Sequence, residues 1–192
     1  MEYLFMQPPF EIKPYKDMSK KEAQAHFDWY IQEIPNRIEL LKAAYSTISG
    51  ENRDELDYSP ESMVKLWKWY IDHVEIEEKS NEIKKIEKKQ YPEWVRIKLS
   101  NQKISIGWMA IAMDIAMYFS ESFIKEHEMI KWGIVSKPKR LAYINKPVLV
   151  GFKGGLDLDS MNLVHVLTSK LIDGDKEENS LLKLYRTWSG NV

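Results

Sequence analysis

Three polar side chains within a largely apolar stretch are spaced so that a helix would place them on one side. The stretch runs from Ile104 to Trp132 and contains Asp114, Tyr118 and Glu121. Intervals of four and three residues bring side chains onto the same helical face. The two acids would then lie about 10 Å apart, measured between their Cα atoms. Two carboxylates at such a spacing could carry out acid–base catalysis or help to hold a hard cation.

The same two acids also have a structural interpretation. Tyr118 follows Asp114 by one helical turn, and Lys125 follows Glu121 in the same way, so each acid has a polar neighbour within its own helix. A catalytic or metal-binding pair would need further groups from another element, and histidine is the natural type. The histidines lie in four different predicted segments and form no ligand pair: His26, His73, His127 and His165. We therefore predict neither catalytic residues nor a metal site.

Cofactor-binding motifs are also missing. The glycine-rich loop GFKGGLDLDS, from Gly151 to Ser160, places a lysine among three glycines ahead of a predicted helix. It has neither the Gly-Lys-Ser/Thr ending of a Walker A loop nor the spacing of a dinucleotide-binding fingerprint. We expect a tight turn there and no cofactor.

A second set of residues has the composition of a protein-binding surface. Trp67 and Trp69 lie two positions apart, so one helix cannot turn both toward the same core. Trp69 falls about 200° around the helix from Trp67 and away from the apolar stripe. A large aromatic side chain beside charged residues is typical of an interface anchor. We therefore predict a partner-binding surface made of Trp69, Glu75, Glu77 and Glu78.

The stretch that carries the polar stripe is predicted to be the central helix of the fold. Met109, Ala112 and Ala116 would lie on one face, while Ile111 and Ile115 make the opposite side apolar as well. Apolar residues on both sides indicate a helix that is buried around most of its circumference.

Helices also account for most of the chain before it. Ser19 with Glu22 forms a capping-box pattern that begins the first helix. Pro35 is expected to end that helix and to open a second one, at an angle to the first, which stops at Gly50. Ser59 and Pro60 begin a third helix, and the charged run from Glu75 to Lys89 predicts a solvated helix after a bend between Glu75 and Ser80.

Strand patterns appear mainly in the second half of the chain. The sequence VRIKLS, residues 95–100, alternates in the manner of a strand, and residues 132–152 predict a small antiparallel sheet. Asp159 or Ser160 would cap a following helix, and Asp175 with Glu178 a last one. The fold class is thus α+β and predominantly helical, with six or seven helices. We expect one domain, 1–192, formed by an extended arm (1–17), a helical part (19–90) and a C-terminal part (91–192).

Composition limits the classes of function. The chain has 192 residues, with 28 Lys and Arg against 29 Asp and Glu, for a formal net charge of −1. No overall field therefore draws it to nucleic acid or to an anionic membrane. Nucleic-acid binding would require the basic residues to cluster on one face. The N-terminal residues do not resemble a secretory signal, and no stretch is long and apolar enough to predict a membrane span, so we expect a cytoplasmic protein.

Three segments of the C-terminal half resemble known sequences. The run DIAMYFSESFI from Asp114 to Ile124, then Lys131, Trp132 and Gly133, and finally PVLVGF from Pro147 to Phe152 resemble a family of uncharacterised proteins from Gram-positive bacteria. A helix with a Tyr and a Glu before a Lys-Trp strand also resembles small intracellular immunity proteins of polymorphic toxin systems. This second resemblance implies a protein partner but transfers no functional residue.

Two functional hypotheses follow from the sequence. The favoured one is a cytoplasmic, immunity-like protein-binding module that covers the surface of a partner protein, with no role in nucleic-acid or membrane binding. The alternative is a small metal-dependent or acid–base hydrolase that uses Asp114, Glu121 and a histidine from another helix.

Overall fold

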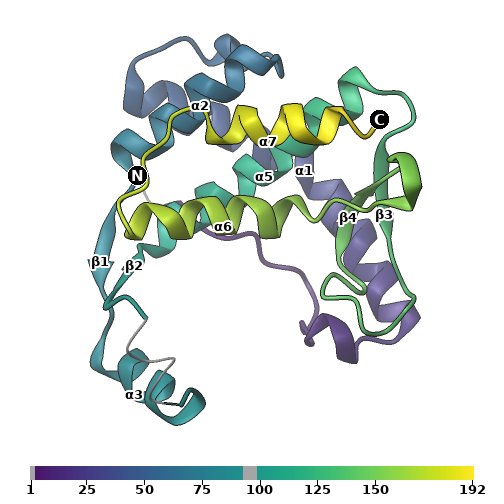
Figure 1. The fold of residues 1–192 in the computed structure, drawn as a ribbon, viewed down its shortest axis with the longest axis horizontal. Coiled ribbons are helices and arrows are strands. Elements are labelled where there is room, and N and C mark those ends of the chain that lie inside the picture. The colour runs from purple at the N-terminus through teal and green to yellow at the C-terminus, as the bar shows by residue number, and fades with distance from the viewer. Residues whose placement is uncertain (1–2, 93–98) are drawn as a thin grey trace.

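The computed structural model describes residues 3–92 and 99–192, and α-helices make up most of this part of the chain (Figure 1). The described residues form six α-helices and two separate two-stranded antiparallel sheets. The predicted α+β, predominantly helical fold is therefore confirmed. Its strands are spread over two small sheets, whereas the sequence indicated one.

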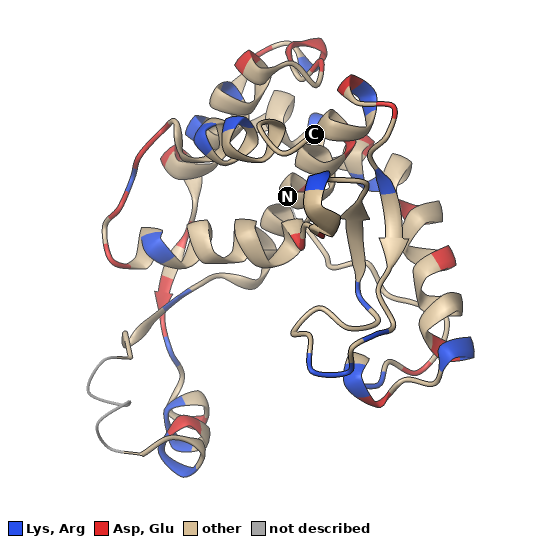
Figure 2. Ribbon diagram, turned by 45° about the vertical axis from the view of Figure 1, so that its right-hand side comes forward, with Lys and Arg blue, Asp and Glu red and all other residues tan. Residues whose placement is uncertain are grey.

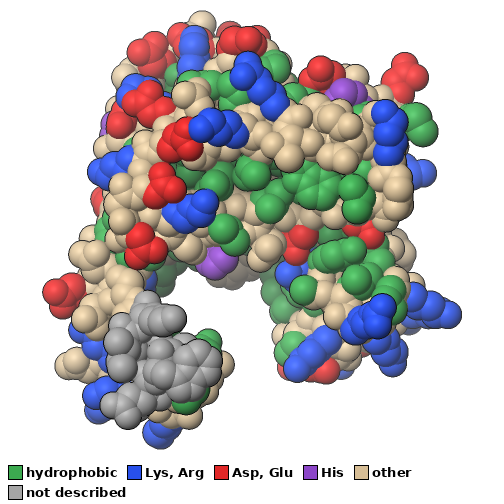
Figure 3. Space-filling model, viewed as in Figure 1, with side chains coloured by type: hydrophobic (Ala, Val, Ile, Leu, Met, Phe, Trp, Pro, Cys, Tyr) green, Lys and Arg blue, Asp and Glu red, His purple; other side chains and the backbone are tan. Residues whose placement is uncertain are grey.

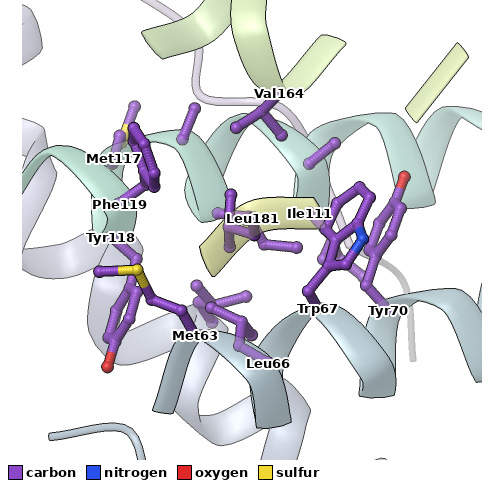
Figure 4. Close-up of a cluster of buried hydrophobic side chains, with 14 of the residues drawn as sticks. Met63, Leu66, Trp67, Tyr70, Ile111, Met117, Tyr118, Phe119, Val164 and Leu181 are labelled. Carbon is purple, nitrogen blue, oxygen red and sulfur yellow. The ribbon is translucent and has the colours of Figure 1, made fainter. Parts of the chain in front are cut away.

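The central helix is α5, Ile106–Glu126, and 13 of its 21 residues are buried. Side chains from α2 (Pro60–His73), α6 (Ser160–Ile172) and α7 (Ser180–Ser189) surround it, as Figure 4 shows for Trp67, Val164 and Leu181. Ala112 and Ala116 are almost completely buried, which allows neighbouring helices to approach closely. The predicted central helix is confirmed, but it is shorter than the stretch from Ile104 to Trp132, because Ile104, Lys131 and Trp132 lie in strands. Among the described residues no helix is long and apolar enough to cross a membrane.

The first helix is longer than predicted. Helix α1 runs without interruption from Lys20 to Ser49, with Pro35 inside it, so the expected pair of angled helices is wrong. An interior proline costs about 3 kcal/mol in a helix. Ile34, Ile38 and Leu41 are buried around it, and their burial offsets that cost. Both predicted ends are confirmed, since Ser19 forms the capping box with Glu22 and Gly50 is left-handed at φ 77°.

A hairpin-like projection follows α2. Strand β1 (Ile76–Glu78) pairs with β2 (Gln102–Ile104), with Ile76 opposite Ile104, and helix α3 (Asn81–Gln90) lies between them in the chain. The predicted bend before the charged helix is confirmed and is occupied by β1. Figure 1 shows that α3 projects from the body at the end of this pair of strands. Most of the predicted strand 95–100 lies outside the described residues.

The C-terminal part forms the second sheet and two helices. Strand β3 (Lys131–Ile134) pairs with β4 (Pro147–Val150), which confirms a small antiparallel sheet within residues 132–152. Asp159 caps α6 as predicted. The residue before α7 is Asn179, so the predicted cap by Asp175 and Glu178 is wrong.

The N-terminal arm is held against the body at both ends. Its described part, from Tyr3 onward, has no regular secondary structure before the short 3-10 turn Tyr15–Asp17. Tyr3 is buried at one end. At the other end the Nδ2 of Asn145 donates hydrogen bonds to the carbonyl oxygens of Tyr15, at 2.8 Å, and Met18, at 3.4 Å. The arm therefore lies against the body and covers part of its surface.

Candidate functional site

Asp114 is the most deeply buried acid of the predicted polar stripe, with 1% of its surface exposed. The Nε of Arg37 donates to one carboxylate oxygen at 2.9 Å, and Nη2 lies 2.8 Å from the other. The hydroxyl of Tyr3 also donates to Asp114. Burial raises the pKa of Asp114 to about 6, although the bonds from Arg37 and Tyr3 oppose this shift. These bonds connect the arm, α1 and α5, so we interpret the role of Asp114 as structural.

Tyr118 and Glu121 have their own partners on other elements. The Tyr118 hydroxyl accepts from the backbone N–H of Tyr58 at 2.6 Å and shares a hydrogen bond with Ser62 at 2.6 Å. Glu121 accepts from the indole N–H of Trp132 at 2.8 Å. Lys125 lies over the ring of Tyr58, 4.4 Å from its centre, and is not the ion-pair partner of Glu121 that its spacing suggested.

The three stripe residues therefore belong to three separate bonded groups. The neighbours expected within the helix are wrong: Asp114 bonds to Arg37 rather than to Tyr118, and Glu121 bonds to Trp132 rather than to Lys125. Their positions on one helix face are as predicted, but each side chain is hydrogen-bonded to a different part of the chain. Asp114 and Glu121 share no hydrogen-bond partner, so this arrangement does not support the hydrolase alternative.

The predicted exposure of Trp69 is wrong, because only 4% of its surface is exposed. Its ring packs 5.6 Å from the ring centres of both Tyr45 and Trp108. The physical reason is that α2 is covered on two sides, by α7 and by the region of α1 and early α5 that holds these two rings. Glu75, Glu77 and Glu78 are exposed as predicted, and Glu77 forms an ion pair with Lys103 at 2.8 Å.

The histidines do not converge. His26 is buried, whereas His73 and His165 are exposed. Within residues 3–92 and 99–192, no group of three or more His, Asp and Glu side chains is placed to hold a metal ion.

A cavity that the sequence did not indicate lies beneath the N-terminal arm, and we call it the aromatic pocket. Its volume is about 290 Å³. Its walls come from the arm, α1, α5, β4 and the start of α6. They are formed by Met6, Ile12, Tyr15, His26, Trp29, Tyr30, Met113, Lys146, Pro147, Asp159 and Met161. Trp29 and Tyr30 follow His26 by three and four residues, so one helix places the three side chains on one face, and this spacing was a signal for the pocket. Aromatic side chains at the same spacing are equally typical of an ordinary core.

Two polar atoms in the walls of the aromatic pocket lack a hydrogen-bond partner in the described part of the chain. The Tyr30 hydroxyl and the Nδ1 of His26 are buried and have no hydrogen-bond partner among the described residues. The other ring nitrogen of His26 lies 3.5 Å from the Tyr15 hydroxyl. Burial lowers the pKa of His26 and raises the pKa of Tyr30 well above its usual value, so both side chains are uncharged at neutral pH.

A second cavity, which we call the methionine groove, adjoins the aromatic pocket. It has a volume of about 270 Å³ and lies on α5 and α6, next to β4. Its walls are Met109, Ala112, Met113, Lys146, Met161, Asn162 and His165, so it shares three residues with the aromatic pocket. Methionine is flexible and polarizable, and it is common at surfaces that adapt to a partner.

Basic side chains gather on two projections of the molecule. One, the α3 tip, is formed by residues 79–91. The other, the loop tip, is formed by residues 11–21 and 135–146, which the hydrogen bond from Asn145 to Tyr15 holds together. Together the tips contain 13 of the 28 Lys and Arg residues but only 4 of the 29 acids. Figure 2 marks Lys and Arg residues in blue along the ribbon of both projections. The charges of this nearly neutral chain are therefore distributed unevenly, with an excess of positive charge on the two tips.

The two tips stand on either side of a hollow (Figure 3). Helix α6 spans the distance between β2 and β4 above this hollow (Figure 1). Nine basic residues of the tips are exposed and form no ion pair with another described residue: Lys16, Lys20, Lys21, Lys85, Lys88, Lys89, Lys137, Lys139 and Arg140. Their charge is therefore directed to solvent or to a partner.

Comparison of the chain with protein-family models, with curated proteins and with solved structures found no match. The resemblances noted in the sequence therefore stay predictions, and the function has to be argued from the chemistry of the surface itself.

Proposed function

We propose that the protein is a cytoplasmic protein-binding module that receives an acidic surface of its partner between the α3 tip and the loop tip. The observation that carries this proposal is the set of nine exposed, unpaired basic residues on the two tips. Complementary charge speeds encounter and selects the partner, because like-charged surfaces are rejected. An immunity-like role, in which the module covers a toxin's surface, is compatible with this kind of contact.

A protein partner suits this face better than a nucleic acid. The bases form two patches, and the surface of α5 and α6 carries the methionine groove. Single-stranded nucleic acid is usually held by exposed aromatic rings within a continuous basic groove. Here the bases form two separate patches instead of one groove, with Tyr91 as an exposed ring on the α3 tip. An apolar centre with a charged rim is the usual anatomy of a protein interface.

This proposal moves the binding surface away from the one that the sequence indicated. Trp69 is covered, so it cannot be an exposed anchor. The acids Glu75, Glu77 and Glu78 lie on or beside β1, at the base of the α3 projection, and Glu77 and Glu78 are paired with Lys103 and Lys84. They are therefore not part of the surface proposed for an acidic partner.

The experiment begins with capture of proteins from a lysate of the native host, followed by purification of each captured protein. The product of the adjacent reading frame is tested in the same way, because a secreted toxin encoded there would be the natural partner of an immunity protein. Each candidate is titrated calorimetrically against the parent and against two charge-reversed variants. One variant carries Lys85→Glu, Lys88→Glu and Lys89→Glu, and the other Lys137→Glu, Lys139→Glu and Arg140→Glu.

The matched control carries the same change of charge outside the two tips: Lys153→Glu, Lys176→Glu and Arg186→Glu, all exposed and without an ion pair to another described residue. We expect an acidic partner whose Kd rises at least about tenfold for each tip variant and changes little for the control. The proposal is wrong if the partner binds the tip variants as tightly as the parent, or if no protein is captured. Tip-dependent retention of RNA or DNA in place of a protein would replace it with nucleic-acid binding.

A further inference from the structure

The aromatic pocket contains two buried polar atoms that form no hydrogen bond with any other described residue. His26 and Tyr30 are each 3% exposed, yet the His26 Nδ1 and the Tyr30 hydroxyl have no hydrogen-bond partner among the described residues. Buried polar groups nearly always find a partner, and an unpaired one is costly. Both side chains line the same cavity, so a molecule in that cavity can lie next to both.

The aromatic walls of the site favour a molecule that itself contains a flat ring. The rings of Tyr15 and Trp29 meet the His26 ring edge to face, with centres 5.1 Å and 5.5 Å away, and Tyr30 lies nearly parallel to it at 6.3 Å. Met113 and Met161 add adaptable apolar surface to the walls. The volume of about 290 Å³ is near the lower end of the range for ligand pockets, which suits a ligand of one or two rings.

The charges of the site favour an uncharged molecule. Lys146 and Asp159 form an ion pair at 3.1 Å, so the one cation and the one anion in the walls neutralise each other. Both oxygens of Asp159 are in use, since the second accepts the backbone N–H of Asn162 at 3.0 Å. A charged ligand would have to break this pair or leave its own charge unpaired in the cavity, and either costs free energy.

The hydrogen-bonding capacity of the two unpaired groups narrows the chemistry further. The Tyr30 hydroxyl can donate to an acceptor. The Nδ1 of a neutral histidine is a donor in one tautomer and an acceptor in the other. A planar group that carries an acceptor beside a donor, such as a carboxamide or the edge of a nitrogen heterocycle, satisfies Tyr30 and either tautomer of His26.

We propose that the aromatic pocket is a binding site for an uncharged planar molecule, an aromatic amide or a nitrogen heterocycle of one or two rings, that hydrogen-bonds to Tyr30 and His26. This site is distinct from the proposed protein-binding function, because none of the nine unpaired bases that carry that proposal lines the pocket, although Ile12, Tyr15 and Lys146 of the loop tip do. Either proposal can fail without the other.

The test uses three simple probes, namely benzamide, benzoate and toluene, and ligand-observed NMR titration with the full chain. Benzamide carries the acceptor and the donor, benzoate has a similar shape with a charge, and toluene has the ring alone. A fragment of this size binds with a Kd on the order of 1 mM. We expect benzamide to bind, and benzoate and toluene to bind at least about fivefold more weakly.

Three variants locate the binding. Tyr30→Phe removes the hydroxyl and keeps the ring, and it should raise the Kd for benzamide about fivefold. Met161→Trp, at a half-buried position on α6, should fill the pocket and abolish binding. Tyr45→Phe, a buried tyrosine of the same helix that does not line the pocket, is the matched control and should leave the Kd unchanged.

The proposal is overturned if benzamide does not bind at millimolar concentration, or if benzoate or toluene binds as well as benzamide. Unchanged binding to Tyr30→Phe or to Met161→Trp would also overturn it, because the probe would then lie elsewhere.

Discussion

The polar groups around Asp114 and those of the aromatic pocket are equally screened from water but differ in their bonding. Asp114 is 1% exposed and receives hydrogen bonds from Arg37 and Tyr3. His26 and Tyr30 are 3% exposed, and each has a buried polar atom without a partner among the described residues. The first cluster lies at the junction of the arm, α1 and α5, and the second lines a cavity.

This difference separates structural from ligand-directed polar groups. A buried group whose bonds are all made within the protein holds its elements together and has nothing left for a ligand. An unsatisfied buried group costs about 1–3 kcal/mol, and a ligand can recover this free energy. The acids that first suggested chemistry thus belong to the structure, while residues that resemble ordinary core form the better candidate site.

The largest effect is expected from breaking the Asp114 cluster. Arg37→Met keeps an apolar stem but leaves the Asp114 carboxylate without its cation, which should lower the free energy of unfolding by about 3–5 kcal/mol. Urea unfolding measures this. The control is Arg53→Met, which removes one member of the exposed pair with Glu39 and should cost less than about 1 kcal/mol. Similar losses in the two variants would mean that the buried pair is not the structural junction that we describe.

The dependence of stability on pH should differ in sign between the two regions. The pKa of Asp114 is raised from 3.8 to about 6, so the folded state binds its proton more tightly than the unfolded state does. This contribution to stability is complete below pH 3.8 and is lost as the pH rises through about 6, a change of up to about 3 kcal/mol. The pKa of His26 is lowered from 6.5 by burial, so its contribution is present above pH 6.5 and is lost as the pH falls.

Unfolding measured between pH 4 and pH 8 in two variants isolates these contributions. Asp114→Asn should remove the fall in stability with rising pH, and His26→Gln should remove the fall with decreasing pH. Changes of the same sign in both variants would show that the two regions do not differ as proposed.

The smallest effects are expected from removing single hydroxyl groups. Tyr118→Phe deletes the hydroxyl that bonds to Tyr58 and Ser62, and leaves the Tyr58 N–H without that acceptor, so it should cost about 1–2 kcal/mol. Tyr30→Phe deletes an unpaired hydroxyl and should change stability by less than about 0.5 kcal/mol or raise it. Thermal melts of the two variants provide the measurement. An equal loss in both would indicate that Tyr30 is bonded within the protein.

Local sequence signals predicted the positions of most helices. The capping box at Ser19, the serine and proline before α2, and the apolar stretch that became α5 each act within a few residues, so they can be recognised without knowledge of the fold. Pro35 is the exception. Its local preference for a helix start was overridden by the burial of Ile34, Ile38 and Leu41, which depends on the packing of α1 against the rest of the molecule.

The chemistry of the sites was decided by tertiary contacts. Periodicity placed Asp114, Tyr118 and Glu121 on one helix face, but the elements that reach them are 77, 60 and 11 residues away in sequence, at Arg37, Tyr58 and Trp132. In the same way, helical geometry showed that Trp69 points away from Trp67, but not that a second layer of aromatic residues covers that side.

The net charge of −1 likewise follows from composition alone, whereas the concentration of bases on two tips does not. The sequence by itself determined the local elements and their apolar faces, because hydrogen bonding and periodicity act between near neighbours in the chain. Only the tertiary structure decided which polar groups are satisfied, which remain open and where charge accumulates, because each of these depends on residues that are far apart in sequence and close in space.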